Sequence, residues 1–451
     1  MRILVINGSP KGNHSITLQT VNYIIRKYPE HTFDVLNAGA TIKAIERDFS
    51  KSAELLSMAD AIIFSYPVYT FIAPSQLHRF IELMKESGVD LTDKYATEIS
   101  TSKHFYDVTA HKYIEENCYD MGMKFVPGLS ADMDDLLTDK GRGEAENFFE
   151  RFLFCVKNGI AHSRVASTSS YRPTPPTLAQ NSPKSDKYDI VIITDNKDTK
   201  SNLAGMIERF RAVLPMKTRV INISDYPFSG GCLGCFMCAV SGKCVYKDGF
   251  DDFLRNDIQK ADSIIYAFEI RDHSMGSRFK MYDDRNFCNG HRTVTVGMPV
   301  GYLVSGEYSK EFNLQMIIEG RSSVGRNFLA GVATDESDTD RAVDELAKSL
   351  NFALDNGYTE PQNFLGVGGM KIFRDLIYEM RGMMRADHKF YKKHGHYDFP
   401  QKRRFSSMKM YLVGAMLASE KIRSKIGSQM KDGMIIPYKK MFEKMDNENK
   451  K

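Results

Sequence analysis

Short apolar runs alternate with amphipathic stretches twice along the chain. In the first series the apolar runs lie at 3–7, 32–36, 61–65, 97–101 and 124–129, with helical spacing at 15–27, 76–85 and 144–158. In the second series they lie at 189–194, 218–223, 263–268, 293–304 and 328–334, with helical spacing at 203–214, 250–260 and 339–356. Nearly continuous apolar strands between amphipathic helices are typical of parallel sheets covered on both faces. The pattern predicts two α/β domains with doubly wound parallel sheets, for which 2-1-3-4-5 is a usual strand order.

Changes in composition divide the chain further. Residues 161–187 are rich in Ser, Thr, Pro and Lys, which indicates an exposed linker between a first domain at 1–160 and a second at 188–357. Residues 358–451 fit neither series. They are basic and Met-rich, and the helical spacing at 370–385 and 407–426 predicts a mostly helical extension that packs across the domains or mediates assembly.

Charge and cysteine content narrow the class of protein. The net charge of +4 over 451 residues does not indicate a nucleic-acid partner. Residues 371–451 carry 20 Lys and Arg against 9 Asp and Glu, which favours a solvated basic tail, with peripheral contact to an anionic membrane surface as the alternative. No leader-like segment opens the sequence, and no apolar run approaches the ~20 residues of a transmembrane helix. Seven cysteines, four of them within thirteen residues, favour a reducing cytoplasm.

A polar loop joins the first strand to the first helix. It reads Gly-Ser-Pro-Lys-Gly-Asn-His-Ser-Ile-Thr over residues 8–17. A helix N-terminus with freed N–H groups is a natural phosphate site, and Ser9, Asn13, Ser15 and Thr17 can donate hydrogen bonds to the phosphate oxygens. Neither a Walker loop nor a dinucleotide fingerprint is present. The alternative is an ordinary turn in which Ser15 only caps the helix.

A second loop follows the third strand with the sequence Ser-Tyr-Pro-Val-Tyr-Thr-Phe, at residues 65–71. Ligands of open α/β sheets bind beyond the carboxyl ends of the strands, so this aromatic loop is expected beside the phosphate loop, where it can stack on a flat ring. Thr101, Ser102 and His104, after the fourth strand, would form a third wall.

These two segments, NGSPKGNHSIT and ADAIIFSYPVYTFIAPSQLHRFIELM, together resemble the NADPH-dependent FMN reductase and iron–sulfur flavoprotein branch of the flavodoxin-like superfamily. The resemblance covers about 160 residues and implies a flavodoxin-like fold with FMN. Carried over, it assigns one set of residues to the FMN phosphate and one to the isoalloxazine ring. The phosphate set is Ser9, Lys11, Asn13, Ser15, Ile16 and Thr17, and the ring set is Pro67, Val68, Tyr69, Thr70 and Phe71. Tyr69 and His104 are the side chains expected to touch substrate.

A compact cysteine motif follows the second strand of the second series. Cys232, Cys235, Cys238 and Cys244 have the spacing C-x2-C-x2-C-x5-C, which is typical of cubane-cluster ligation, whereas structural zinc sites usually separate two close pairs. Iron–sulfur flavoproteins carry such a motif, and the resemblance implies a [4Fe–4S] cluster. Redox-active thiols and zinc are the alternatives. Small apolar roles are expected for Cys118, Cys155 and Cys288, and solvent exposure for His388, His394 and His396.

Each half lacks what the other carries. The first half has no cysteines after its second strand, and in the second half Asp195 and Asp198 replace the phosphate loop. Because members of the resembling family assemble as oligomers, the tandem resembles such a dimer fused into one chain. We therefore expect the flavin site and the cysteine motif to lie near each other. The fold class expected is two flavodoxin-like domains in tandem with a helical C-terminal extension.

The function expected is that of a flavin-dependent oxidoreductase. NAD(P)H would reduce FMN, which would pass electrons to a small-molecule or protein acceptor, with the cluster as a relay. The alternatives are a non-enzymatic electron carrier between proteins, and a metal- or redox-sensing module with a vestigial flavin site. A homo-oligomer is an open expectation.

Overall fold

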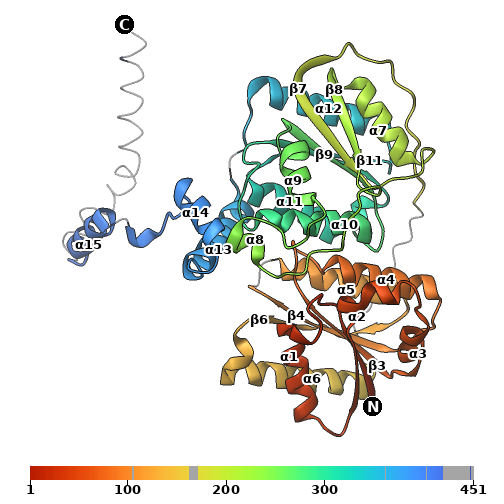
Figure 1. Cartoon of the computed structure of the whole chain (residues 1–451). Helices are drawn as coiled ribbons and strands as arrows, with labels where there is room; N and C mark the ends of the chain where they lie inside the picture. The colour runs from red at the N-terminus through yellow and green to blue at the C-terminus, as the bar shows by residue number, and fades with distance from the viewer. Residues whose placement is uncertain (104–105, 162–170, 361, 403, 420–446, 448–451) are drawn as a thin grey trace. The chain divides into compact units, whose positions relative to one another are not determined.

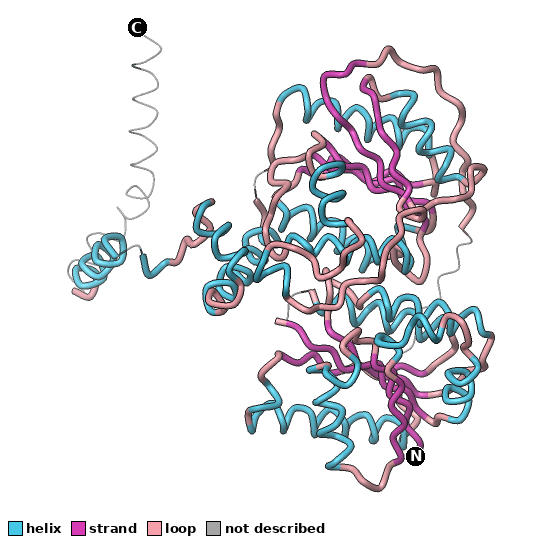
Figure 2. Tube along the Cα trace, viewed as in Figure 1, coloured by secondary structure: helices cyan, strands magenta, loops and turns pink. Residues whose placement is uncertain are grey.

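The computed structural model describes all residues except 104–105, 162–170, 361, 403, 420–446 and 448–451. His104 and the first part of the expected linker lie outside the described residues. Two parallel sheets and a helical C-terminal region make up the structure (Figures 1 and 2), in agreement with the predicted fold class. By contacts the chain forms two compact units, residues 1–390 and 391–451, so residues 358–390 belong to the same unit as both sheets.

The first sheet has the order β2-β1-β3-β4-β5, and β6 also pairs with β4. All its pairings are parallel. Its strands are β1 (Arg2–Asn7), β2 (Thr32–Leu36), β3 (Ala61–Pro67), β4 (Tyr95–Ser102), β5 (Lys124–Phe125) and β6 (Leu129–Asp132). Its helices are α1 (Ile16–Lys27), α2 (Ala38–Ile45), α3 (Ser50–Met58), α4 (Ser75–Ser87), α5 (Asp107–Asp120) and α6 (Asp139–Asn158).

Alternate residues of each buried strand supply two separate cores of this domain, because successive side chains point to opposite faces. Ile3 and Val5 pack with α1 and α6, whereas Leu4 and Ile6 pack with α2 to α5 (Figure 1). The predicted strand at 124–129 is divided in two. Pro127 lies between β5 and β6 and has no N–H to donate to β4.

The second sheet has the order β8-β7-β9-β10-β11, again 2-1-3-4-5 and parallel. Its strands are β7 (Ser185–Thr194), β8 (Met216–Asn222), β9 (Ser263–Glu269), β10 (Pro299–Ser305) and β11 (Phe328–Thr334). Its helices are α7 (Asn202–Val213), α8 (Met237–Ser241), α9 (Phe250–Phe253) with a π-helical turn Leu254–Ile258, α10 (Gly276–Arg285), α11 (Phe312–Gly325) and α12 (Thr339–Asn356). Helices α7 and α12 cover one face of this sheet, and α9 to α11 cover the other.

The predicted strand at 293–304 is wrong at its beginning, since β10 starts at Pro299. Gly297 has φ +82°, a left-handed conformation that interrupts extended backbone. Proline is tolerated at the first position of a strand, where its missing N–H costs the ladder least.

The two domains contact each other through corresponding helices. Helix α4 packs against α10, and α5 packs against α11. The loops that precede α4 and α10 have the same backbone conformation. A short bridge joins Tyr69 to Ile72 in one and Arg271 to Ser274 in the other, and the two residues inside each bridge have positive φ. The contact is therefore a pseudo-two-fold one, as in an isologous dimer.

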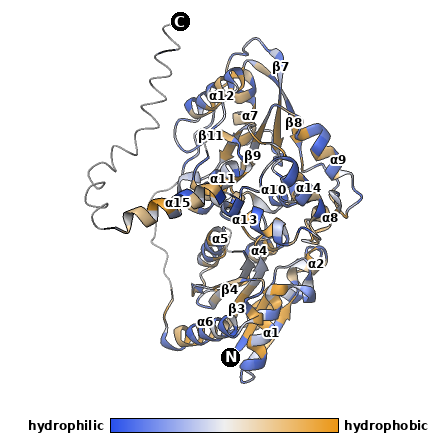
Figure 3. Cartoon of the chain, turned by 90° about the vertical axis from the view of Figure 1, so that its left-hand side faces the viewer, coloured by the Kyte–Doolittle hydropathy of each residue, from blue (hydrophilic) through white to orange (hydrophobic). Residues whose placement is uncertain are grey.

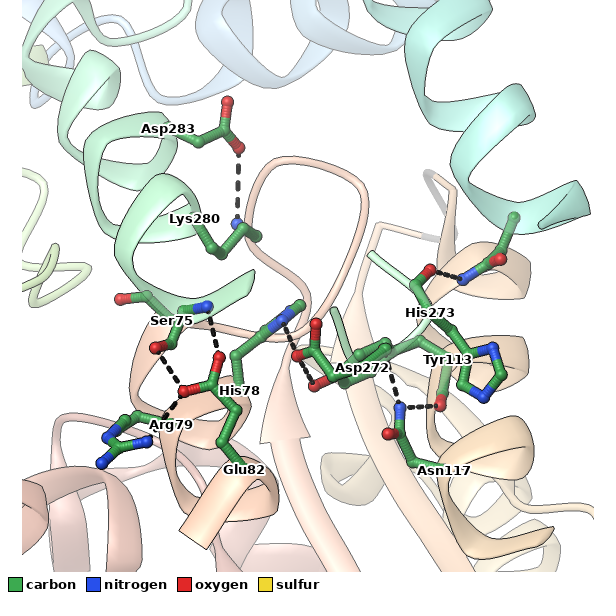
Figure 4. Close-up of polar contacts among 12 residues, drawn as sticks. Ser75, His78, Arg79, Glu82, Tyr113, Asn117, Asp272, His273, Lys280 and Asp283 are labelled. Carbon is green, nitrogen blue, oxygen red and sulfur yellow. Dashed lines mark hydrogen bonds and ion pairs between the residues drawn. The ribbon is translucent and has the colours of Figure 1, made fainter. Parts of the chain in front are cut away.

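Polar side chains of both domains meet at this interface (Figure 4), and two of their contacts correspond to each other. The N–H of Ser75 donates to Asp284 at 2.8 Å, and the N–H of the corresponding Ser277 donates to Glu82 at 2.7 Å. His78 and Tyr113 both contact Asp272, at 2.9 and 2.8 Å. The equivalent of His78 in the second domain is Lys280.

The C-terminal region begins with α13 (Phe364–Glu379), which packs on α11, and continues with α14 (Arg385–Lys393) and α15 (Arg404–Leu417). The predicted helix at 370–385 thus starts and ends earlier. Helix α15, which carries much hydrophobic colour in Figure 3, has exposed side chains at Phe405, Tyr411 and Leu412. Within the described residues, no helix is both long and apolar enough to cross a bilayer. Short 3-10 helices lie at Gly12–His14, Asp135–Leu137, Asn286–Asn289, Tyr308–Lys310 and Pro400–Lys402.

Candidate functional site

The loop between β1 and α1 is shaped by Asn7. The buried Asn7 side chain donates to the carbonyl of Gly12 at 2.9 Å and to Asn37 at 2.8 Å, and its Oδ1 accepts from the N–H of Ser9. The turn at Gly12 has φ +53°, where a side chain would be strained. These bonds fix the loop so that it ends at the first turn of α1.

The first turn of α1 carries a hydroxyl that has no partner. Ser15 caps the helix by accepting from the N–H of Leu18 at 3.4 Å. Thr17 is buried, and no hydrogen bond to its Oγ1 exists among the described residues. The same holds for the buried Oγ1 of Thr101, at the end of β4. Buried polar atoms normally have partners, so these two orphaned hydroxyls beside a helix N-terminus fit an anionic ligand such as the FMN phosphate.

The aromatic loop after β3 is held in a strained turn. Thr70 and Phe71 have φ values of 47° and 73°, which are uncommon for residues with side chains. The N–H of Tyr69 donates to Ile72 at 2.7 Å, and Phe71 packs on Tyr106 with ring centroids 4.5 Å apart. The Thr70 hydroxyl is used within the interface, where it contacts Asp283, Asp284 and Lys280.

The cysteine loop of the second domain is fixed by three arginines. Arg255 donates to the carbonyls of Gly242 and Cys288 at 2.6 and 3.1 Å. Arg292 donates to the carbonyls of Cys238 and Cys288, both at 3.2 Å. Both arginines also pair with carboxylates, Arg255 with Asp251 at 3.6 Å and Arg292 with Asp387 at 2.7 Å, so they fix the loop's backbone without adding net positive charge.

The third arginine, Arg285, is nearly inaccessible to solvent. It is bonded to Asp248 at 2.8 and 2.9 Å and lies over the Tyr246 ring at 4.4 Å. It also donates to the carbonyl of Gly230 at 2.9 Å. A bidentate arginine–carboxylate pair has fixed geometry, so it sets the path of the chain that enters the cysteine motif.

One cavity of about 440 Å³ is lined by both candidate sites. In the first domain its lining residues are Ser9, Lys11, Ser15, Ile16 and Thr17 of the phosphate loop, Pro67 to Phe71 of the aromatic loop, and Thr101 and Ser102 of β4. In the second domain they include all four motif cysteines. Asn13 is not part of the lining, and its Oδ1 accepts from Asn37 at 2.9 Å. The Lys11 ammonium lies 5.8 Å from the centre of the Phe236 ring in the cysteine motif, so the two loops face each other directly.

Sequence patterns missed several residues of this cavity. Cys288 lines it, although its isolation in the sequence suggested a purely apolar role. Ile372, Phe373 and Leu376 of α13 form part of its wall, and Asp387, fully buried, binds Arg292 at 2.7 Å. No local pattern could have marked these residues, because their partners lie tens to hundreds of positions away.

The motif cysteines differ in exposure. Cys235 is exposed, whereas the others are partly buried. Burial raises the pKa of the Cys232 thiol to about 12 and that of Cys238 to about 11. As free groups both are therefore protonated at neutral pH, and a bound metal would deprotonate them.

The corresponding region of the second domain is filled by its own side chains. The buried Asp335 carboxylate accepts from Ser305 Oγ at 2.7 Å, from the N–H of Gly306 at 2.9 Å and from Asn202 at 3.1 Å. Tyr171 adds a fourth bond at 2.7 Å. An internal carboxylate thus occupies the space between the first turn of α7 and the end of β10.

Comparisons with known proteins agree with this division. Residues 1–132 match the Flavodoxin_2 family, which is described as flavodoxin-like fold. The "Iron-sulfur flavoprotein" of Archaeoglobus fulgidus is 25% identical over 175 residues, covering 36% of this chain and 78% of that protein.

Among solved structures, two illustrate the likeness. The FMN complex of general stress protein 14 from Treponema denticola covers 35% of this chain and 99% of its own, at 15% identity and TM-score 0.28. The NAD(P)H:quinone oxidoreductase from Methanothermobacter marburgensis covers 37% and 99%, at 15% identity and TM-score 0.26. The match to the Flavodoxin_2 family covers residues 1–132, and with the Archaeoglobus relative it is consistent with the FMN reductase and iron–sulfur flavoprotein branch of the flavodoxin-like superfamily.

Proposed function

We propose that the chain is an FMN-dependent oxidoreductase whose second domain holds a [4Fe–4S] cluster beside the flavin of the first. The observation that carries the proposal is the single cavity lined by the phosphate loop, the aromatic loop and all four motif cysteines. Two redox groups bound there would be close enough for direct electron transfer within one chain.

The residues of the first domain would bind and orient the flavin. The N-terminal N–H groups of α1 and the hydroxyls of Ser9 and Thr17 would hold the phosphate, because the helix dipole and free donors favour an anion. Val68 and Tyr69 would border the ring, with the backbone of Val68 fixed by its bond to the Thr101 carbonyl at 3.1 Å. The bound flavin supplies the hydride and electron chemistry, with NAD(P)H as the donor.

The second domain would supply the cluster site. A motif of C-x2-C-x2-C-x5-C lets four thiolates surround one compact group. Arg255, Arg285 and Arg292 donate to carbonyls of the loop and would hold it in the form that surrounds the group. The name of the Archaeoglobus relative supports the same assignment.

A second candidate function is electron carriage between proteins. Cys235 is exposed, so one edge of a cluster held there would be accessible to a docking partner. NAD(P)H separates the two functions, since an enzyme uses it directly and a carrier does not.

Anaerobic purification of the full chain, followed by flavin, iron and sulfide analysis and a visible spectrum, tests the proposal. We expect one FMN and four irons per chain, with flavin absorbance bleached by NADH or NADPH. Bleaching only by dithionite or a reduced protein would favour the carrier, and a preparation without flavin or iron would refute both.

A further inference from the structure

The hydroxyl of Tyr69 reaches across the domain boundary onto the cysteine motif. A Cβ placed on Gly234, between Cys232 and Cys235, would lie 1.8 Å from Tyr69 Oη and 2.6 Å from its Cζ. The phenol therefore lies directly on the Gly234 backbone. Glycine is required at 234 both for this approach and because its φ is +59°.

This hydroxyl has no hydrogen-bond partner among the described residues, although its oxygen is buried. A buried hydroxyl without a partner loses its bonds to water and gains nothing in return, at a cost of about 1–3 kcal/mol. Its position beside the cysteine motif indicates that the missing partner belongs to the group that the motif binds.

The Tyr69 backbone is held in place from both domains. Its N–H donates to Ile72 at 2.7 Å, and its carbonyl accepts from Lys280 Nζ of the second domain at 3.2 Å. On the other side, the N–H of Gly234 donates to Cys232 Sγ at 3.4 Å, which places a sulfur within the same turn. The phenol and the sulfur are thus fixed independently of each other.

We propose that Tyr69 is a positioning residue for the cluster, donating a hydrogen bond from its hydroxyl to a sulfur of the group that the four cysteines bind. This inference rests on the proposed function. A hydrogen bond to a cluster sulfur stabilises the more negative, reduced state and so raises the reduction potential. The loop that borders the flavin in one domain thereby sets the potential of the cluster in the other.

The test is a redox titration of the full-length, anaerobically purified protein, followed by the visible spectrum of the cluster. Tyr69→Phe keeps the ring and its packing but removes the donor, so the cluster midpoint potential should shift to a more negative value at unchanged iron and sulfide content. Incorporation of 3-fluorotyrosine at position 69, a more acidic donor, should shift it in the opposite direction.

Tyr246→Phe is the matched control. The Tyr246 hydroxyl also bonds the cysteine loop, but to the backbone carbonyl of Gly231 at 3.1 Å, so its loss loosens the loop without removing a donor to sulfur. An unchanged potential in Tyr69→Phe, or equal shifts in Tyr69→Phe and Tyr246→Phe, would overturn the inference. So would loss of iron from Tyr69→Phe together with an unshifted fluorotyrosine protein. Absence of iron from the wild-type protein would instead refute the proposed function itself.

Discussion

The two domains share a strand order and a mode of packing but differ at the carboxyl ends of their strands. In the first domain the region between the start of α1 and the end of β4 is a cavity edged by the hydroxyls of Thr17 and Thr101, which have no partner within the part of the chain that the structure describes. In the second domain the same region is closed by Asp335, which accepts four hydrogen bonds. The first domain therefore has hydrogen-bond donors available for a bound anion, whereas in the second domain the corresponding donors are bonded to Asp335.

The difference teaches how a symmetric arrangement can become specialised. In an isologous dimer both copies would carry the same residues, so every change would appear twice. In a tandem chain each position is independent. His78 and Lys280 occupy equivalent places on α4 and α10, yet the first faces Asp272 and the second faces Thr70, Asp283 and Asp284.

The largest expected effect comes from the cysteine loop, which only one half possesses. Cys232→Ser should reduce the iron content of the anaerobic protein to background while FMN remains bound, because a cluster site with three thiolates is incomplete. Cys155→Ser, on the buried face of α6, is the control and should keep its iron. Equal iron in both variants would show that the motif does not bind a cluster.

The second effect concerns the interface. Lys280 is fully buried with Asp284, and its Nζ lies 3.5 Å from Asp283. Lys280→Met leaves the buried Asp284 without its cation, while Asp283 keeps Arg321, so we expect a loss of about 3–5 kcal/mol in the free energy of unfolding, measured with urea. Lys124→Met removes an exposed pair with Asp93 and should cost less than about 1 kcal/mol. Similar costs for the two variants would contradict the buried network.

The third effect is a pH dependence of the free energy of unfolding, which arises from His273 at the contact between the two domains. His273 is surrounded by Glu116 and Asp120 of α5 and by Glu311, and hydrogen bonds and charge from Asp120 and Glu311 outweigh burial and raise its pKa from 6.5 to about 9. A pKa raised on folding stabilises the protein fully below pH 6.5, and this stabilisation, about 3 kcal/mol, is lost as the pH rises through 9.

Thermal unfolding from pH 6 to 10 checks this expectation. The Tm of the wild-type protein should fall more steeply above pH 7 than that of His273→Gln. The exposed His14→Gln should follow the wild type. Parallel curves for wild type and His273→Gln would refute the linkage.

A fourth variant tests whether the second domain has truly lost its anion site. Asp335→Asn replaces an acceptor of four hydrogen bonds by an amide that can satisfy fewer of them, so unfolding should become easier by about 2 kcal/mol. FMN should stay at one per chain, because Asp195 and Asp198 still oppose a phosphate near α7. A second bound flavin in Asp335→Asn would show that the carboxylate alone closes the site.

The smallest effect is expected at the phosphate loop itself. Thr17→Val removes one neutral donor to the phosphate, which should weaken FMN binding about tenfold, or ~1.4 kcal/mol. Thr20→Val on the same helix is the control, since its side chain does not line the cavity. Fluorescence titration of the apoprotein with FMN gives both dissociation constants, and equal values would place the phosphate elsewhere.

The sequence by itself determined the features that depend on near neighbours. The alternation of apolar and amphipathic runs predicted both sheets, since strands buried on two faces read as nearly continuous apolar runs, and the strand order was expected as a usual one for such sheets. The phosphate loop and the cysteine motif are also local, because their spacing alone defines a helix N-terminus and a compact ligand set. The predicted limits were wrong for two strands, at 124–129 and 293–304, because Pro127 and Gly297 interrupt the extended backbone there.

Only the tertiary structure decided what those local features share. Four features of the cavity join residues that are far apart in sequence. They are the contact of Phe236 with Lys11, the arginines around the cysteine loop, the cavity wall formed by α13, and the contact of the Tyr69 phenol with Gly234. Such contacts leave no periodic mark, because they arise from packing two domains through α4, α5, α10 and α11. That packing brings both candidate redox sites into one cavity.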